Sequence, residues 1–298
     1  MSTPFRIRQI LFPTDFSTSS EAAAQYVARF AKEIAARVSL VHVLAWLPAW
    51  RGASESYYSN LEAKALRDLE AQQAVDEEAA CIALAAFKER YFPDVETVAC
   101  IKSGGVTDSI IEHATDIGAD LVMMPTRGLG PLRRFLIGST TAKVLHDLQR
   151  PLWTTPHVKE LEQFSPWQHV VCAMDYRTLT PDLLLRAKGV AEIFGSRLTV
   201  VSAIPFAGRT AVHTDHASIH PLKREVTASI KAMLSELNVQ AGVEVLEGSA
   251  GEIVSEEAAL EDADLIVIGQ GHLDKPMGHL RTHAYEIIWN APCPVLKI

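Results

Sequence analysis

Short apolar runs alternate with longer amphipathic stretches along the first half of the chain. The runs have strand length and several are rich in β-branched residues, whereas the stretches between them place apolar residues every three or four positions, as helices do. Five strands alternating with helices predict a doubly wound α/β domain with a parallel sheet. The predicted strands are 9–14, 38–44, 95–101, 121–124 and 152–155, and the longest predicted helix is 61–90.

The same order of patterns then starts again. Residues 169–175 repeat the first strand and its final aspartate, so that Asp175 matches Asp15 at an offset of 160, and residues 291–298 match 148–155 at an offset of 143. A repeat of this length indicates two tandem domains. The prediction is an N-terminal domain at 1–157, a linker at 158–167 and a C-terminal domain at 168–298, each with a five-stranded parallel sheet flanked by helices.

One stretch of the first half has the pattern of a phosphate-binding turn. The predicted strand Leu121–Met124 leads to Gly128, and a second turn at Gly138 opens a helical pattern that starts with Ser139. Glycines let backbone N–H groups approach a ligand closely, and a helix start offers N–H groups and a partial positive charge. Ser139 can cap this helix and still reach an anion.

Composition narrows the classes of partner. The 298 residues suit two domains of ordinary size, and 48% hydrophobic with 21% charged residues is typical of a globular protein. The formal net charge of −8 argues against nucleic acid or an anionic membrane as a partner. The chain has no apolar stretch of membrane-spanning length and no paired-cysteine motif, so we expect a cytoplasmic protein. Its four cysteines are scattered at positions 81, 100, 172 and 293.

Together these residues resemble the universal stress protein family in its tandem, two-domain form, with a Rossmann-like fold of the adenine nucleotide α-hydrolase type. Residues 10–17 resemble the family's first strand, and His42-Val43 resembles the end of its second. The family's Gly-x-x-Gly, nine residues, Gly-Ser/Thr motif falls on Pro125, Gly128, Gly138 and Ser139. Pro125 departs from the motif and removes one backbone donor.

The resemblance implies an ATP-binding sensor or adaptor of the stress response, with Mg²⁺ accompanying the nucleotide. It also implies that the two domains pair within the chain through their last strands, and it leaves a homodimer open. By motif position, the residues implied for adenine and ribose are Pro13, Thr14, Asp15, Val43 and Met124, and those implied for the triphosphate are Gly128, Gly138, Ser139 and Thr140.

The second half keeps the strands but loses the glycine motif. His272 takes the place of the second glycine, and Thr282-His283 takes the place of Gly-Ser. We therefore expect the C-terminal domain to hold no ATP. Two groups of histidines, at 213, 216 and 220 and at 272, 279 and 283, are interpreted as loop and helix-start residues, and no metal site is predicted.

Two alternatives remain open. The chain could be a protein-interaction module whose nucleotide site is vestigial in both halves. It could also be an ATP-pyrophosphatase-type enzyme, because Ser103-Gly-Gly105 and the following Asp108 resemble that phosphate loop, although one residue too many separates them and the segment follows the third strand. Capping of a helix by Thr107 or Asp108 is the simpler interpretation. No nucleophile–base pair is evident, so catalysis beyond slow ATP hydrolysis is not predicted.

Overall fold

A computed structural model of the 298-residue chain describes residues 6–45, 63–126, 137–155, 165–205, 219–270 and 283–298, without the side chains of 63–70 and 219–220. The chain forms two compact units, Ile7–Arg150 and Pro151–Ile298. The predicted α/β class and the tandem arrangement are confirmed.

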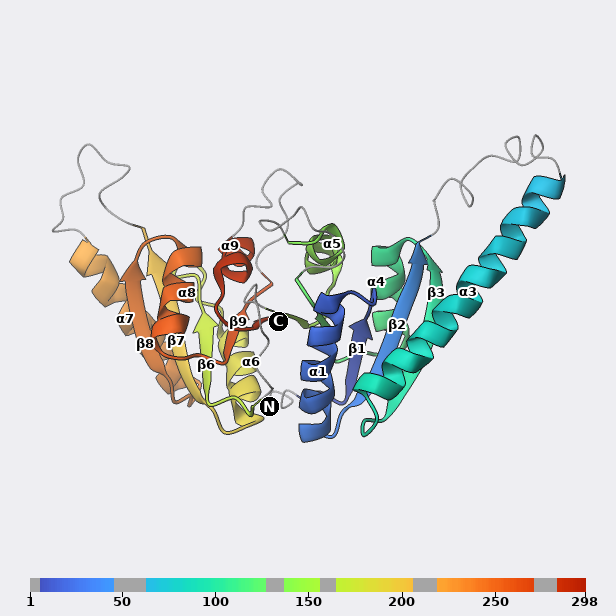
Figure 1. The fold of residues 1–298 in the computed structure, drawn as a ribbon. Helices are drawn as coiled ribbons and strands as arrows, with labels where there is room; N and C mark the ends of the chain where they lie inside the picture. Colours follow the sequence, from blue (N-terminus) through green and yellow to red (C-terminus); the bar gives the residue numbers. More distant parts are fainter. Residues whose placement is uncertain (1–5, 46–62, 127–136, 156–164, 206–218, 271–282) are drawn as a thin grey trace. The chain divides into compact units, whose positions relative to one another are not determined.

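The first unit is a parallel sheet with the strand order β3-β2-β1-β4, and helices pack against it (Figure 1). The long helix predicted at 61–90 is α3, which packs on β2 and β3. The elements of this unit are β1 (Gln9–Pro13), α1 (Thr18–Glu33), β2 (Arg37–Ala45), α3 (Ala63–Tyr91), β3 (Thr97–Gly104), α4 (Val106–Asp116), β4 (Leu121–Met124) and α5 (Ser139–Asp147).

The second unit has the strand order β5-β10-β9-β6-β7-β8. Its strands are parallel except where β5 meets β10. Its elements are β5 (Leu152–Thr154), β6 (His169–Ala173), α6 (Pro181–Glu192), β7 (Arg197–Ile204), α7 (Ile219–Glu236), β8 (Gly242–Glu247), α8 (Ala250–Leu260), β9 (Leu265–Ile268), α9 (His283–Asn290) and β10 (Val295–Lys297).

The central strands are buried on both faces. Ile10, Leu11 and Phe12 of β1 are fully buried, and all four residues of β4 are buried as well. Helices that cover both faces of a parallel sheet remove the alternation of polar and apolar residues, which is why these strands are continuous apolar runs in the sequence. No helix in the described ranges is long and apolar enough to cross a membrane.

Strand β5 comes from the first sequence repeat but pairs with the last strand of the second. Residues Leu152–Thr154 run antiparallel to Val295–Lys297, and the Thr154 hydroxyl donates to the Val295 carbonyl at 3.4 Å. Trp153 and Thr154 are each 1% exposed. The last strands of the two repeats therefore lie side by side in the second unit, and β5 groups with that unit by its contacts.

Trp167 ends the segment predicted as the linker, yet it is packed. Its side chain is 2% exposed and meets Phe194 edge-on at 5.1 Å between ring centroids. The Ser196 hydroxyl donates to the Trp167 carbonyl at 2.7 Å. The packed part of the second unit thus includes Trp167, two residues before the start of β6.

Candidate functional site

The strand order of the first unit reverses between β1 and β4, and this place is called the switch point. The chain passes from β1 to β2 and β3 on one side and then returns to place β4 on the other side of β1. In open α/β sheets, ligands bind at the carboxyl ends of the strands where the order reverses in this way. The register Leu11↔Val122 brings the ends of β1 and β4 next to each other, and with them the predicted residues Pro13 and Met124.

The segment after β1 is held firmly in place. The Thr14 N–H donates to the Val41 carbonyl at 2.9 Å, which extends the ladder between β1 and β2 by one residue. The Thr14 carbonyl lies 2.8 Å from Nδ1 of His42, which donates to it. Both backbone groups of Thr14 are thus fixed by β2, and its side chain is 5% exposed.

Phe16 reverses the chain direction just after this point. It has a φ of 59°, in the left-handed region that a bulky residue rarely adopts. Its ring stacks on His42 at 4.4 Å and meets Phe87 of α3 edge-on at 5.8 Å, while its N–H donates to Thr14 Oγ1 at 3.1 Å. These contacts hold the sharp turn that aims Asp15 at the start of α1.

Asp15 uses one carboxylate oxygen to organise the N-terminus of α1. Its Oδ1 accepts from the Ser17 N–H at 3.0 Å and from the hydroxyls of Ser17 and Ser20, each at 2.6 Å. Ser17 is the N-cap residue of α1 and accepts from the Ser20 N–H. Hydrogen bonds to a charged acceptor are short and strong, so Asp15 has a structural role at this turn.

The start of α5 lies against the segment that follows β4. The Gly138 N–H donates to the Thr126 carbonyl at 2.8 Å, and the Thr141 hydroxyl donates to the Pro125 carbonyl at 3.0 Å. Thr126 and Thr141 are 2% and 3% exposed. Pro125 therefore contributes an acceptor here, where the family motif has a glycine.

The prediction that Ser139 caps α5 is wrong. Gly138 is the N-cap residue, with an extended ψ of 143°, and Ser139 is the first helical residue. No side chain caps this helix, and the N–H groups of Ser139, Thr140 and Thr141 have no acceptor among the described residues. Such N–H groups, together with the positive end of the helix dipole, favour an anion.

The remaining predicted positions divide into two sets. Val43 and Met124 are buried at the ends of β2 and β4, with 9% and 5% exposure. Gly128 lies outside the described residues, as do the histidines at 213, 216, 272 and 279.

The second half offers an internal comparison at an offset of 160 residues. The Met174 N–H donates to the Val201 carbonyl at 2.9 Å, and the Ser202 hydroxyl donates to the Met174 carbonyl at 2.8 Å. These bonds reproduce those of Thr14 with Val41 and His42. The residue that follows the first strand of each repeat is therefore anchored to the second strand in the same way.

The next residue is an aspartate in both halves, Asp15 and Asp175, but its partners differ between the two halves. Arg177 stands where the first half has Ser17, and its Nε and Nη2 donate to the two oxygens of Asp175 at 3.2 and 3.0 Å. Partial burial would raise the pKa of the Asp175 carboxyl, but the hydrogen bonds and charge of Arg177 outweigh it and hold this pKa below its ordinary value. A guanidinium thus occupies both oxygens of Asp175.

The Ser-Gly-Gly segment is a turn from β3 into α4. Gly104 has a φ of 136°, which requires glycine, and Gly105 is the N-cap residue of α4. The interpretation that Thr107 or Asp108 caps this helix is therefore wrong, since no side chain does. The segment follows the outermost strand of the unit, two strands away from β1 and the switch point.

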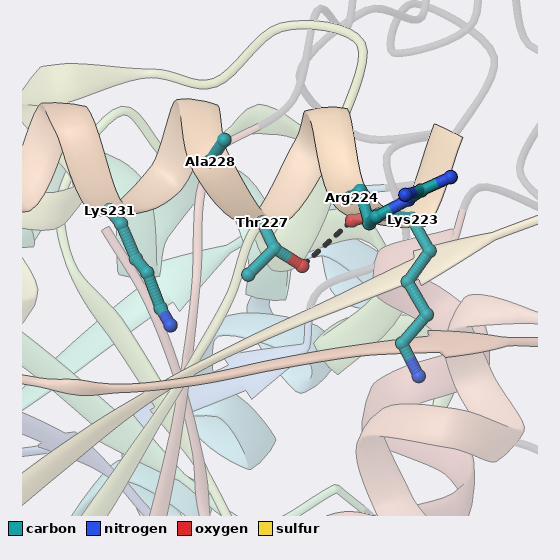
Figure 2. A pocket seen from close by; sticks show the side chains of 5 residues that line it. All are labelled: Lys223, Arg224, Thr227, Ala228 and Lys231. Atoms are coloured by element: carbon teal, nitrogen blue, oxygen red, sulfur yellow. Dashed lines mark hydrogen bonds between the residues drawn. The ribbon is translucent and has the colours of Figure 1, made fainter. Parts of the chain in front are cut away.

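A separate open hollow lies along α7 (Figure 2). It is lined by Lys223, Arg224, Thr227, Ala228 and Lys231, and the Thr227 hydroxyl donates to the Lys223 carbonyl at 2.7 Å. All five residues belong to one helix, so none comes from the strand ends that form the candidate site.

Several residues of the site were not singled out by sequence reasoning. His42 was noted only as part of a strand end, and Thr126 and Thr141 were not noted for any role, although all three fix the backbone near the switch point. Ser17 and Ser20 could have been found, because a serine two and five residues after a strand-end aspartate suits a helix cap.

Comparisons with known proteins agree on the family. A family model described as the universal stress protein family matches residues 6–156 and again 166–298. A universal stress protein from Archaeoglobus fulgidus DSM 4304 has a similar fold, with a TM-score of 0.66, 17% identity, and 98% of this chain and 96% of that chain covered. A functionally unknown protein from Pseudomonas aeruginosa PAO1 follows with a TM-score of 0.61, 16% identity, and 98% and 92% covered.

None of the curated proteins compared with the chain gave a significant match. The two solved structures share too little sequence to show more than the fold. The family model, in contrast, covers nearly the whole chain in two consecutive matches. The chain therefore belongs to the universal stress protein family, with two family domains in tandem.

Proposed function

We propose that the protein binds ATP with its N-terminal domain, residues 1–157, and acts as a nucleotide-dependent sensor or adaptor in a stress response. The observation that carries this proposal is the start of α5. Its three N–H groups without described acceptors lie beside the carboxyl ends of β1 and β4, at the point where the strand order reverses. A negatively charged group is the natural ligand of such a helix start.

The residues near the switch point between β1 and β4 suit the triphosphate and the adenine of the nucleotide. The triphosphate would lie on the N–H groups of Ser139 and Thr140 and against Gly138, whose own N–H is already bonded to the Thr126 carbonyl, with Gly128 as a further contact and Mg²⁺ on the phosphate oxygens. The adenine would lie against Pro13, Val43 and Met124, which are buried or nearly so at the strand ends.

The ribose would lie between Thr14 and Asp15. A carboxylate at this position would accept a hydrogen bond from a ribose hydroxyl. The bonds from Ser17 and Ser20 already fix the orientation of the Asp15 side chain, so little side-chain entropy would be lost on binding.

The C-terminal domain would act as a structural and interaction partner. Asp175 is held by Arg177 on both oxygens, so binding a ribose there would require breaking an ion pair. The domain would instead contribute β10, which pairs with β5. All four cysteines are free, which is consistent with the reducing cytoplasm as the proposed location.

The first test is whether ATP stabilises the folded chain. A ligand that binds only the folded state stabilises it by about 2.7 kcal/mol at a concentration of 100 Kd, so the Tm should rise with Mg-ATP concentration. Denaturing the purified protein should release bound ATP or ADP, which mass spectrometry would detect. Absence of released nucleotide, together with an unchanged Tm at millimolar Mg-ATP, would favour the interaction module with a vestigial site.

A further inference from the structure

β3 is the outermost strand of the first unit, and one of its edges is open in the described part of the chain. The Val38 N–H donates to the Glu96 carbonyl, so even-numbered residues of β3 bond to β2. In a parallel ladder the alternate residues then direct their N–H and C=O groups the other way. The backbone groups of Thr97, Ala99 and Ile101 therefore point outward, and such a row is a template for another strand.

The two elements at this edge, β3 and α3, carry exposed apolar side chains. Among the described residues, Val98 of β3 is 67% exposed, and Val75 and Ile82 of α3 are 58% and 66% exposed. The two α3 residues are seven positions apart, so they lie on one face of the helix. The only other exposed large hydrophobic residue in those ranges is Leu260. Val98 is thus an exposed apolar residue on an open edge strand, which suits pairing with another strand.

The charged residues of β3 indicate which strand could pair with its open edge. If a second copy of β3 pairs antiparallel about an axis at Ala99, Glu96 lies opposite Lys102 and Val98 lies opposite Cys100. The two-fold axis repeats each pair, giving two pairs of opposite charge and two apolar pairs. Moving the axis by one residue, to Cys100, would instead place Val98 opposite Lys102. Cross-strand pairs of opposite charge favour the first register.

We propose that two copies of the chain associate by antiparallel pairing of their β3 strands about Ala99, so that the two sheets continue into each other. The contact is isologous and closes after two copies, which is the commonest symmetry of soluble oligomers. A two-fold axis perpendicular to the sheet keeps both α3 helices on the same face. Val75 and Ile82 lie on the side of α3 opposite its buried residues Ala80, Leu84 and Phe87, so they point away from the sheet and lie outside this contact. This association does not depend on nucleotide binding.

Disulfide trapping tests the pairing and its register. Val98 and Cys100 would be a directly opposed pair without mutual hydrogen bonds, whose Cβ atoms lie about 4.5–5.5 Å apart, close to what a disulfide needs. In a Cys81→Ser background, Val98→Cys should give a covalent dimer with oxidised glutathione, and Val98→Cys with Cys100→Ser should give none. A covalent dimer formed through Cys100 without the Val98 change would overturn the register.

Sedimentation equilibrium tests the association itself. Ala99→Pro removes an outward N–H and leaves the β2 ladder intact, so the dimer should be lost, while the urea midpoint should stay unchanged at a concentration where the wild type is monomeric. Val98→Pro is the matched control, because it removes a donor to β2 and should lower the urea midpoint. Glu96→Lys and Lys102→Glu should each weaken the dimer about tenfold, and the double variant should restore it.

Glu96 also pairs with Arg37 at 2.9 Å on the surface, where both side chains are about two-thirds exposed. Such an exposed pair contributes little to stability, so loss of the dimer in Glu96→Lys reports on the association and not on unfolding. A wild-type chain that remains monomeric across the micromolar range would refute the proposal. So would a dimer that survives Ala99→Pro and gives no disulfide with Val98→Cys.

Discussion

Ser139→Pro tests the phosphate role of α5 by removing one N–H group. Ser139 is the first helical residue, where proline is well tolerated, and the preceding Gly138 already has the extended ψ that proline requires. The helix should therefore remain folded while one donor to the phosphates is lost. A hydrogen bond to a charged group contributes about 1.5–3 kcal/mol, so the Kd for Mg-ATP should rise about 10- to 150-fold.

Isothermal titration calorimetry would measure this change, with urea denaturation confirming that the fold is intact. His283→Pro is the matched control, because His283 is the first residue of α9 at the corresponding position of the second half. It should leave the Kd unchanged. Ser139→Ala keeps the backbone N–H and removes only the hydroxyl, so it separates the contribution of the hydroxyl to the Kd from that of the N–H. Equal affinity of Ser139→Pro and the wild type, or loss of affinity in His283→Pro, would refute the assignment.

Three further predictions concern stability. Asp15→Ala removes an acceptor of three hydrogen bonds and should lower the free energy of unfolding by about 2–4 kcal/mol, with a smaller loss for Asp15→Asn, measured by urea denaturation. Because the pKa of Asp175 is lowered in the folded state, its stabilisation is present above the ordinary aspartate pKa and is lost as the pH falls below about 4. The urea midpoint of Arg177→Ala should therefore fall less steeply in acid than that of the wild type, and an equal slope would contradict the role of Arg177. Burial, and then the charge of Lys102, lower the pKa of His113, so the unfolded chain binds a proton there first and stability should fall as the pH drops below about 6.5. His113→Gln, which cannot titrate, should flatten this part of the pH profile of the urea midpoint.

The sequence alone was sufficient to predict the strands and the long helix. β1 and β4 were visible as apolar runs because both faces of the sheet are covered, and α3 was visible from a long stretch without proline or glycine. The tandem arrangement followed from the repeat. These features depend on residue type and spacing alone, which is why they could be predicted.

The details of the candidate site depend on backbone angles that the sequence leaves open. Gly138 and Ser139 can each be an N-cap, and only the extended ψ of Gly138 shows which one is. The three bonds to Asp15 require the left-handed turn at Phe16, which no residue pattern predicts for a phenylalanine. The second half has no such left-handed residue at Tyr176, the position that corresponds to Phe16, and there Asp175 is bonded to Arg177 instead. Contacts of this kind become visible only in the structure.

The pairing of β5 with β10 shows a similar limit. Apolar periodicity predicts both strands, but it does not say which strand an edge strand joins. The family resemblance supplied that expectation, and the register of Leu152–Thr154 with Val295–Lys297 supplies the geometry.

The stoichiometry of ATP binding tests the central claim most directly. Titration of the purified, nucleotide-free wild-type chain with Mg-ATP should give one binding site per chain, since only the first half has the Gly-Ser start of α5, and the strand-end aspartate of the second half is bonded to Arg177 through both oxygens. Two equivalent sites per chain would show that the second half binds as well. No measurable binding at millimolar Mg-ATP would contradict the account.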